Sequence, residues 1–155
     1  ELSKGRKARI LLTSREGHGK ITEIHERLGW PVLIQEQEAY LLPDISDIET
    51  FSIEYMTRSG LRLLWTPGPT PGSCVVYAPE PWNVLFCGCL LIPVKFDEIA
   101  SFRNRRTFHW SRHRRSLEKL RNWIPSKANP RLASGASLKL LGDQLVVPWE
   151  AWKER

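Results

Sequence analysis

The sequence predicts one domain of the α/β class, with α+β features, over residues 1–155. Two patterns carry this prediction. The N-terminal part alternates short apolar runs with an amphipathic helix, as a β-α-β unit does. The middle part holds three short apolar runs separated by turn residues, and an amphipathic helix follows them. With 155 residues, 41% of them hydrophobic, the chain is long enough to bury one core.

The β-α-β unit is expected first along the chain. Its strand, helix, second strand and short final helix are predicted at residues 8–13, 20–28, 31–35 and 36–42. Ile21, Ile24 and Leu28 lie on one helical face, and Gly29 follows where a helix commonly ends. Two strands joined through a helix predict a parallel pair with a right-handed crossover.

The elements after this unit are less regular. Strands are predicted at residues 61–65, 73–77 and 83–87, with irregular chain at 43–60 and a loop at 93–108. Ser111 is the expected N-cap of a helix that reaches Trp123 and is closed by Pro125. Two apolar runs around Gly142-Asp143 predict a hairpin near the C-terminus.

The loop TPGPTPGS, residues 66–73, contains two Thr-Pro-Gly triplets. Proline fixes φ, and glycine reaches conformations that other residues avoid. The loop is therefore expected to be rigid, and its centre, Pro69, is expected to be buried. A loop of this kind commonly holds a functional group in place.

Basic residues are concentrated in one segment. The net charge is +6, and residues 101–123 hold eight Lys and Arg side chains against one carboxylate, Glu118. Six of them, interleaved with Phe108, His109 and Trp110, form the arginine cluster: Arg103, Arg105, Arg106, Arg112, Arg114 and Arg115. Arginines among aromatic rings are typical of nucleic-acid-binding segments, and a solvated surface that docks an acidic partner is the alternative. His109 and His113 are expected to add to the positive field at mildly acid pH.

The cysteine content and the hydropathy of the chain indicate its cellular compartment. The three cysteines, Cys74, Cys87 and Cys89, are few and odd in number, which favours a reducing compartment over a disulfide framework. No apolar run is long enough to span a membrane, and the chain opens with polar and basic residues. These features predict a cytoplasmic protein without a membrane partner.

Four motifs together identify a family resemblance: LLTSREGHG at residues 11–19, TPGPTPGS at 66–73, VLFCGCLL at 84–91 and ASGAS at 133–137. In this order and spacing, the chain resembles the metallo-β-lactamase superfamily, in its hydrolase branch, and a bacterial member of it. The resemblance implies an αββα sandwich. Because the chain begins almost at the first motif, part of the N-terminal sheet is expected to be missing, and the uncovered sheet is expected to favour a homo-oligomer.

The resemblance also implies where metal ligands would stand. In the family, the first motif reads His-x-His-x-Asp-His, the Thr-Pro-Gly loop centres on His, and Gly-Asp and Gly-His pairs complete a site for two zinc or iron ions. The corresponding positions here are Ser14, Glu16, His18 or Gly19, Pro69, Cys89 and Ala136.

These substitutions argue against a dinuclear centre, because proline and alanine offer no side-chain donor. The expectation is a protein without a cofactor, more a pseudoenzyme with a binding or structural role than a hydrolase. One alternative is a hydrolase with a rebuilt one-zinc site formed by Glu16, His18 and Cys89. A second is a module that binds nucleic acid or an acidic partner through the arginine cluster.

Overall fold

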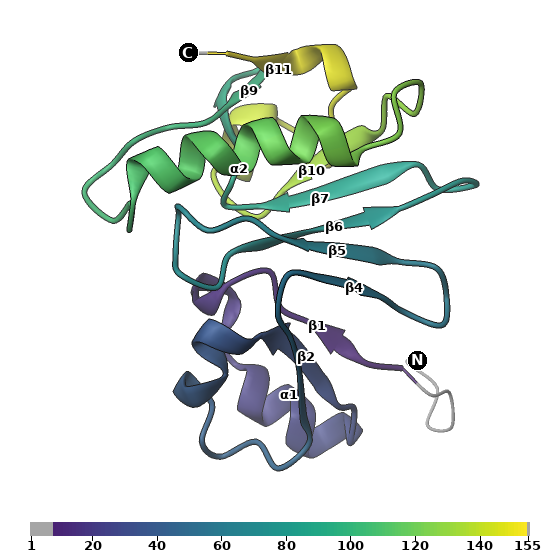
Figure 1. The fold of residues 1–155 in the computed structure, drawn as a ribbon, viewed down its shortest axis with the longest axis vertical. Coiled ribbons are helices and arrows are strands. Elements are labelled where there is room, and N and C mark those ends of the chain that lie inside the picture. Colours follow the sequence, from purple (N-terminus) through teal and green to yellow (C-terminus); the bar gives the residue numbers. More distant parts are fainter. Residues whose placement is uncertain (1–7, 155) are drawn as a thin grey trace.

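A parallel β-α-β unit forms one side of the molecule, as the hydrophobic periodicity predicts (Figure 1). The computed structural model describes residues 8–154. The first sheet has the order β1-β2-β3 with all neighbours parallel. Gly29 ends α1 with φ of 64°, a left-handed conformation that glycine adopts without strain. The elements are β1 (Ile10–Leu11), α1 (Ile21–Leu28), β2 (Val32–Gln35) and β3 (Ile48–Phe51).

The second sheet has five strands in the order β10-β7-β6-β5-β4. Its strands pair antiparallel, except that β10 runs parallel to β7. The three strands predicted at residues 61–87 are its centre, so this part of the prediction is confirmed. The elements are β4 (Glu54–Met56), β5 (Arg62–Trp65), β6 (Cys74–Ala78), β7 (Val84–Gly88) and β10 (Arg131–Ser134).

Alternate side chains of the strands divide the core into layers. In β2, Val32 and Ile34 belong to the cluster that contains Ile21 of α1. Leu33, between them, belongs instead to a cluster with β5 and β6 of the second sheet. On the other face of β6, Val75 packs in a cluster with side chains of α2 (Trp110–Trp123). The layers therefore follow the order helix, sheet, sheet, helix, and the αββα sandwich is confirmed.

Within residues 8–154, a small third sheet, in the order β11-β9-β8, and four 3-10 helices complete the fold. The strands are β8 (Ile92–Lys95), β9 (Glu98–Ala100) and β11 (Trp152–Lys153), and the 3-10 helices are η1 (Arg15–Gly17), η2 (Glu36–Leu41), η3 (Leu138–Leu141) and η4 (Trp149–Ala151). No helix of the described residues is long and apolar enough to cross a membrane.

Several sequence predictions were wrong in detail. The stretch 43–60 contains β3 and β4, and 93–108 contains most of the β8-β9 hairpin. These strands were missed because their burial is mixed, without a clean alternation. The short helix expected at 36–42 is the 3-10 helix η2. The predicted C-terminal hairpin is absent from the described chain: η3 buries only Leu141, and Val147 makes an isolated bridge to Leu132.

Helix α2 begins at Trp110, two residues earlier than an N-cap at Ser111 would require. His109 is the N-cap: its backbone is extended, and its Nδ1 accepts a hydrogen bond of 3.3 Å from the backbone N–H of Arg112. The imidazole thus takes the place of the usual hydroxyl or carboxylate cap. The predicted end is confirmed, since Trp123 is the last helical residue and Pro125 lies just beyond the C-cap.

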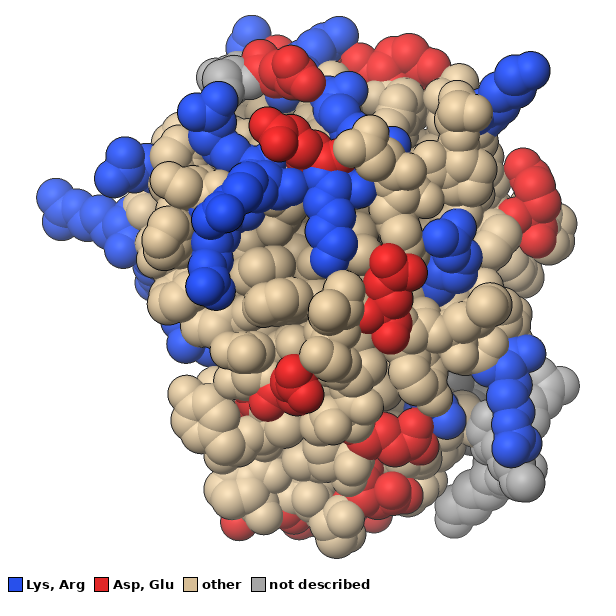
Figure 2. All heavy atoms as spheres, viewed as in Figure 1, with Lys and Arg blue, Asp and Glu red and all other residues tan. Residues whose placement is uncertain are grey.

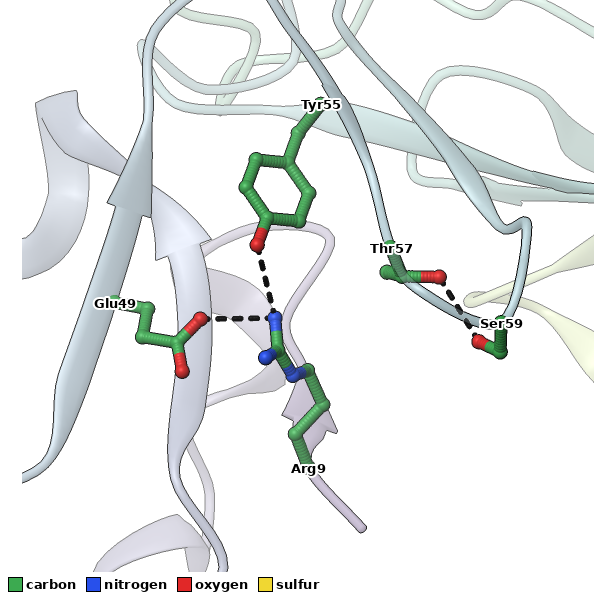
Figure 3. Close-up of polar contacts among 5 residues, drawn as sticks. All are labelled: Arg9, Glu49, Tyr55, Thr57 and Ser59. Carbon is green, nitrogen blue, oxygen red and sulfur yellow. Dashed lines mark hydrogen bonds and ion pairs between the residues drawn. The ribbon is translucent and has the colours of Figure 1, made fainter. Parts of the chain in front are cut away.

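A polar contact joins the two sheets at one edge of the sandwich (Figure 3). The Nη1 atom of Arg9 lies 2.8 Å from a carboxylate oxygen of Glu49 in β3 and donates a 3.2 Å hydrogen bond to the hydroxyl of Tyr55 in β4. Nearby, the hydroxyls of Thr57 and Ser59 lie 2.9 Å apart across the turn after β4. The contacts of Arg9 involve partly exposed groups, so they orient the sheets more than they stabilise them.

Candidate functional site

Six segments of the chain line one pocket of about 200 Å³. They are η1, the Thr-Pro-Gly loop between β5 and β6, the loop between β9 and α2, α2 itself, the chain after β7 and the chain after β10. The backbone N–H of Gly135 donates a 2.8 Å hydrogen bond to the carbonyl of Gly88, which brings the last two segments side by side. We call this cavity the site pocket. Its lining residues are Glu16, Pro69, Thr70, Cys89, Ile92, Phe102, Asn104, Arg106, Thr107, His113, Ala136 and Ser137.

The site pocket gathers four of the residues that stand at the family's ligand positions. Glu16, Pro69, Cys89 and Ala136 all line it. Ser14, His18 and Gly19 are not among the lining residues, although they belong to the same first loop.

The polar side chains of the first loop differ in their partners. Ser14 is buried, and its Oγ accepts a 3.2 Å hydrogen bond from the N–H of Glu16. The ring of His18 is partly buried, its Nε2 has no partner within the described chain, and burial lowers its pKa. His18 is therefore neutral near pH 7. Glu16 itself is exposed at the mouth of the loop.

Cys89 is the thiol that could serve as a ligand. Burial raises the pKa of this thiol, and the negative charge of Glu16 acts in the same direction, against a hydrogen bond with Ser14 that lowers it. A thiol binds a metal as the thiolate, so this environment disfavours the ligand form. The other two cysteines are buried within the core, where burial raises the pKa of Cys74 and of Cys87 to about 12. All three cysteines are free.

The Thr-Pro-Gly loop is buried at its centre, as predicted. The N–H of Thr66 donates to the carbonyl of Ser73 over 2.8 Å, which closes the loop at its base. Pro69 and Thr70 are buried against the site pocket. The hydroxyl of Thr70, a residue only 2% exposed, has no hydrogen-bond partner within the described chain.

The same loop is fixed to α2 by several contacts. The N–H groups of Phe108 and His109 donate to the carbonyls of Pro69 and Gly68, over 3.2 and 3.0 Å. Gly68 has φ of 149°, and a Cβ added there would lie 2.3 Å from Cα of His113. Only glycine permits this approach of loop and helix backbones.

His113 differs from the sequence prediction. It was expected to add positive charge to the arginine cluster, but it is 1% exposed, and burial lowers its pKa. Its Nε2 lies 2.9 Å from the carbonyl of Leu90, which can only accept, so Nε2 carries the hydrogen. In the neutral ring, Nδ1 is then an acceptor, and it has no partner among the described residues. The prediction for His113 is therefore wrong.

Glu38 was missed by the sequence analysis, which placed it in a short helix without a role. It is fully buried, and its carboxylate accepts from the N–H of Arg15 over 2.6 Å and from the N–H of Gly72 over 3.0 Å. A Cβ at position 72 would lie 2.7 Å from Cγ of Glu38, so glycine is needed there. Glu38 thus joins the first loop to the Thr-Pro-Gly loop. No local sequence pattern predicts that Glu38 joins these loops, because its two hydrogen bonds connect residues that are 23 and 34 positions apart in the sequence.

The arginine cluster lies on the loop before α2 and on the first half of this helix. All six side chains are exposed, and within residues 8–154 none of them forms an ion pair. Figure 2 shows Lys and Arg side chains gathered over α2 and the loop that precedes it, while the opposite end of this face is mostly uncharged, with several Asp and Glu side chains among the other residues. One member, Arg106, also lines the site pocket.

The donor atoms at the site pocket differ from those of a two-metal centre. Within the described residues, no group of three or more His, Cys, Asp and Glu side chains is arranged as metal ligands. Glu16, Cys89 and His113 do line one pocket, but the hydrogen on the His113 Nε2 is held by a carbonyl and the Cys89 thiol favours its protonated form. The donor set does not match the His and Asp set of a two-metal site.

Comparisons with known proteins agree with the architecture. The family model described as the metallo-beta-lactamase superfamily matches residues 9–123, so the chain belongs to this superfamily. A comparison with curated proteins gave no significant match.

Solved structures share the fold at low sequence identity. The BLEG-1 B3 metallo-beta-lactamase is 19% identical, with a TM-score of 0.66 over 92% of this chain and 72% of the other. A metallo-beta-lactamase from Pontibacter korlensis is 22% identical, with a TM-score of 0.63 over 88% and 70%. TTHA1623, solved in a di-iron-bound form, is 19% identical, with a TM-score of 0.65 over 92% and 73%.

Proposed function

We propose that this chain is a non-catalytic binding protein of the superfamily, which has lost the dinuclear centre and binds its ligand in the site pocket without a metal. One observation carries the proposal: Pro69 and Ala136 line the pocket at two former ligand positions, and neither has a donor atom. Metal affinity depends on the number and geometry of donors, so the loss of several ligands removes the site and not only part of its strength.

Two buried polar atoms suggest what the pocket binds instead. The Thr70 hydroxyl and the His113 Nδ1 have no partner within the described chain, and an unsatisfied buried polar atom costs about 1–3 kcal/mol. The His113 Nδ1 needs a hydrogen-bond donor, such as a hydroxyl or amine. Arg106 supplies a positive charge at the same pocket. A small organic anion that carries a hydroxyl or amino group fits these three groups.

Zinc titration of the purified protein tests the loss of the centre. We expect substoichiometric zinc after mild chelation, no rise of Tm on addition of zinc, and no hydrolysis of esters, thioesters, lactams or phosphodiesters above background. Pro69→His should fold and still fail to bind zinc tightly, because one imidazole does not complete a site. Ser137→Ala, at the same pocket but outside the former ligand positions, is the matched control.

The rebuilt one-zinc hydrolase is the alternative that these measurements separate. It requires Glu16, His18 and Cys89 to supply three ligands and leave one position for water. One zinc per chain, bound tightly and lost together with hydrolytic activity in Cys89→Ser, would establish that alternative and refute the non-catalytic proposal.

A second candidate function is polyanion binding through the arginine cluster. It is favoured by six exposed arginines that have no ion pair within the described chain and that repel one another unless an anion lies between them. With about four phosphate contacts to a single strand, log affinity should fall against log salt with a slope of roughly −3. Fluorescence anisotropy measures this dependence, and an affinity that does not change with ionic strength would refute this candidate function.

A further inference from the structure

A groove of about 310 Å³ lies between α2 and the start of the Thr-Pro-Gly loop, apart from the site pocket. Its helical wall consists of residues at positions i, i+3, i+4 and i+7 of α2, which share one face. The loop wall carries an aromatic ring. The lining residues are Trp65, Pro67, Arg112, Arg115, Ser116 and Lys119.

The walls of this groove are held in place by hydrogen bonds. The Ser116 hydroxyl donates to the carbonyl of Pro67 over 2.7 Å, and the Lys119 ammonium donates to the carbonyl of Trp65 over 3.3 Å. The indole N–H of Trp65 donates to the carbonyl of Pro71 over 2.8 Å, which fixes the ring while leaving it partly exposed. The groove is thus formed before any ligand arrives, which lowers the entropy cost of binding.

The groove carries three cationic side chains and no acidic lining residue. Arg112 and Arg115 form no ion pair within the described chain. The negative charge of Glu54 acts on Lys119, and this carboxylate also accepts a hydrogen bond from the indole of Trp123. Of the other two cations of α2, Arg121 pairs with Glu154 over 2.9 Å, whereas Arg114 forms no ion pair within the described chain and does not line the groove. Two unpaired arginines therefore line the same groove as the Trp65 side chain.

We propose that this groove binds a nucleotide unit, with its phosphate held by Arg112, Arg115 and Lys119 and its base stacked on Trp65. Bidentate guanidinium groups suit phosphate, and aromatic rings provide a platform for bases of any sequence. The unit belongs to a single-stranded nucleic acid or to a free nucleotide, which share this chemistry. The inference rests on the second candidate function, polyanion binding, and assigns it a location and a ligand class.

Fluorescence anisotropy with a labelled oligothymidylate of about 12 nucleotides tests the location, since single-strand sites span about 4–16 nucleotides. Arg112→Ala/Arg115→Ala should weaken binding and reduce the salt slope by about 1.4, the value for two lost phosphate contacts. Arg103→Ala/Arg105→Ala removes the same charge outside the groove, so it should change affinity and slope much less. Equal losses in the two double variants would refute the groove and leave polyanion binding intact, whereas no salt-dependent binding by the unchanged protein would refute both.

The role of the Trp65 ring is tested separately from that of the cationic side chains. Trp65→Leu should weaken oligothymidylate binding roughly 5- to 140-fold, the equivalent of one lost stacking contact, and leave binding of inorganic polyphosphate unchanged. Trp82→Leu, at an exposed tryptophan outside the groove, is the control. If Trp65→Leu does not fold, a competition experiment replaces it. Polyphosphate and polyglutamate of matched charge are compared with unlabelled oligothymidylate as competitors of the labelled oligonucleotide. Base recognition would be refuted if either polyanion displaced the oligonucleotide as well as oligothymidylate does. Competition by adenosine monophosphate at similar affinity per site would identify a free nucleotide as the ligand, and its failure would identify a single strand.

Discussion

Glu38 provides the sharpest test of how the site is held together. Its buried carboxylate accepts hydrogen bonds from two backbone N–H groups, those of Arg15 and Gly72. Glu38→Ala leaves both donors buried without an acceptor. A hydrogen bond to a charged group contributes about 1.5–3 kcal/mol, so the two together predict a loss of about 3–6 kcal/mol in the free energy of unfolding. This is a large share of the 5–15 kcal/mol typical of a domain.

Urea denaturation measures this loss. With an m-value of about 1.5 kcal/mol per M, a loss of 3 kcal/mol lowers the midpoint by about 2 M. Glu36→Ala is the matched control, because Glu36 lies in the same 3-10 helix but is exposed, and it should change stability by no more than about 0.5 kcal/mol.

Glu38→Gln covers the case in which the alanine variant does not fold. Its amide oxygen can accept from one of the two N–H groups, while its NH₂ group faces the other donor. The expected loss is therefore intermediate, about 1.5–3 kcal/mol. If Glu38→Ala lowered stability by less than 1 kcal/mol, the carboxylate would not be what joins the two loops, and the reasoning would fail.

Three further outcomes are expected. Gly68→Ala should abolish or severely weaken folding in thermal melts, because its Cβ would overlap the backbone of His113; a normal Tm would contradict the close approach. His113 has a pKa below its ordinary value of 6.5, so its contribution to the free energy of unfolding is complete above pH 6.5 and is lost as the pH falls below this value. His113→Gln should therefore reduce the decrease of the urea midpoint between pH 7 and pH 5. The decrease that remains includes the contribution of His18, whose pKa is also lowered. His109→Ala should cost about 0.5–2 kcal/mol as a lost N-cap, whereas Ser111→Ala should be near neutral; the reverse order would favour Ser111 as the cap.

The sequence predicted the elements whose signal is local. The helical spacing of Ile21, Ile24 and Leu28 and the stop at Gly29 gave the β-α-β unit, because each of these signals lies within a few residues. Strands β3 and β4 were not predicted. Ile48 in β3 is only half-buried and Met56 in β4 is exposed, so neither strand shows a clear alternation of buried and exposed residues. Edge strands with mixed burial carry little periodicity to detect.

The same division applies to the site. Glu16, Pro69, Cys89 and Ala136 could be placed together from motif order, and they do line one pocket. Glu38 could not be placed, because a buried acid is defined by partners that only the tertiary fold supplies. For His113, the surrounding arginines suggested an exposed cation, but burial depends on where the helix face points and not on neighbours in sequence.

The Thr-Pro-Gly loop is a shared wall of two cavities. Pro67 lines the groove beside Trp65, and Pro69, two residues further on, lines the site pocket. The carbonyl of Pro67 accepts a hydrogen bond from Ser116 of α2, and the carbonyl of Pro69 accepts one from the N–H of Phe108, just before this helix. Because one short loop lines both cavities, a ligand that displaced this loop at one cavity would move the wall of the other. If such a displacement changes the affinity at the second cavity, thermodynamic reciprocity requires the coupling to act equally in both directions.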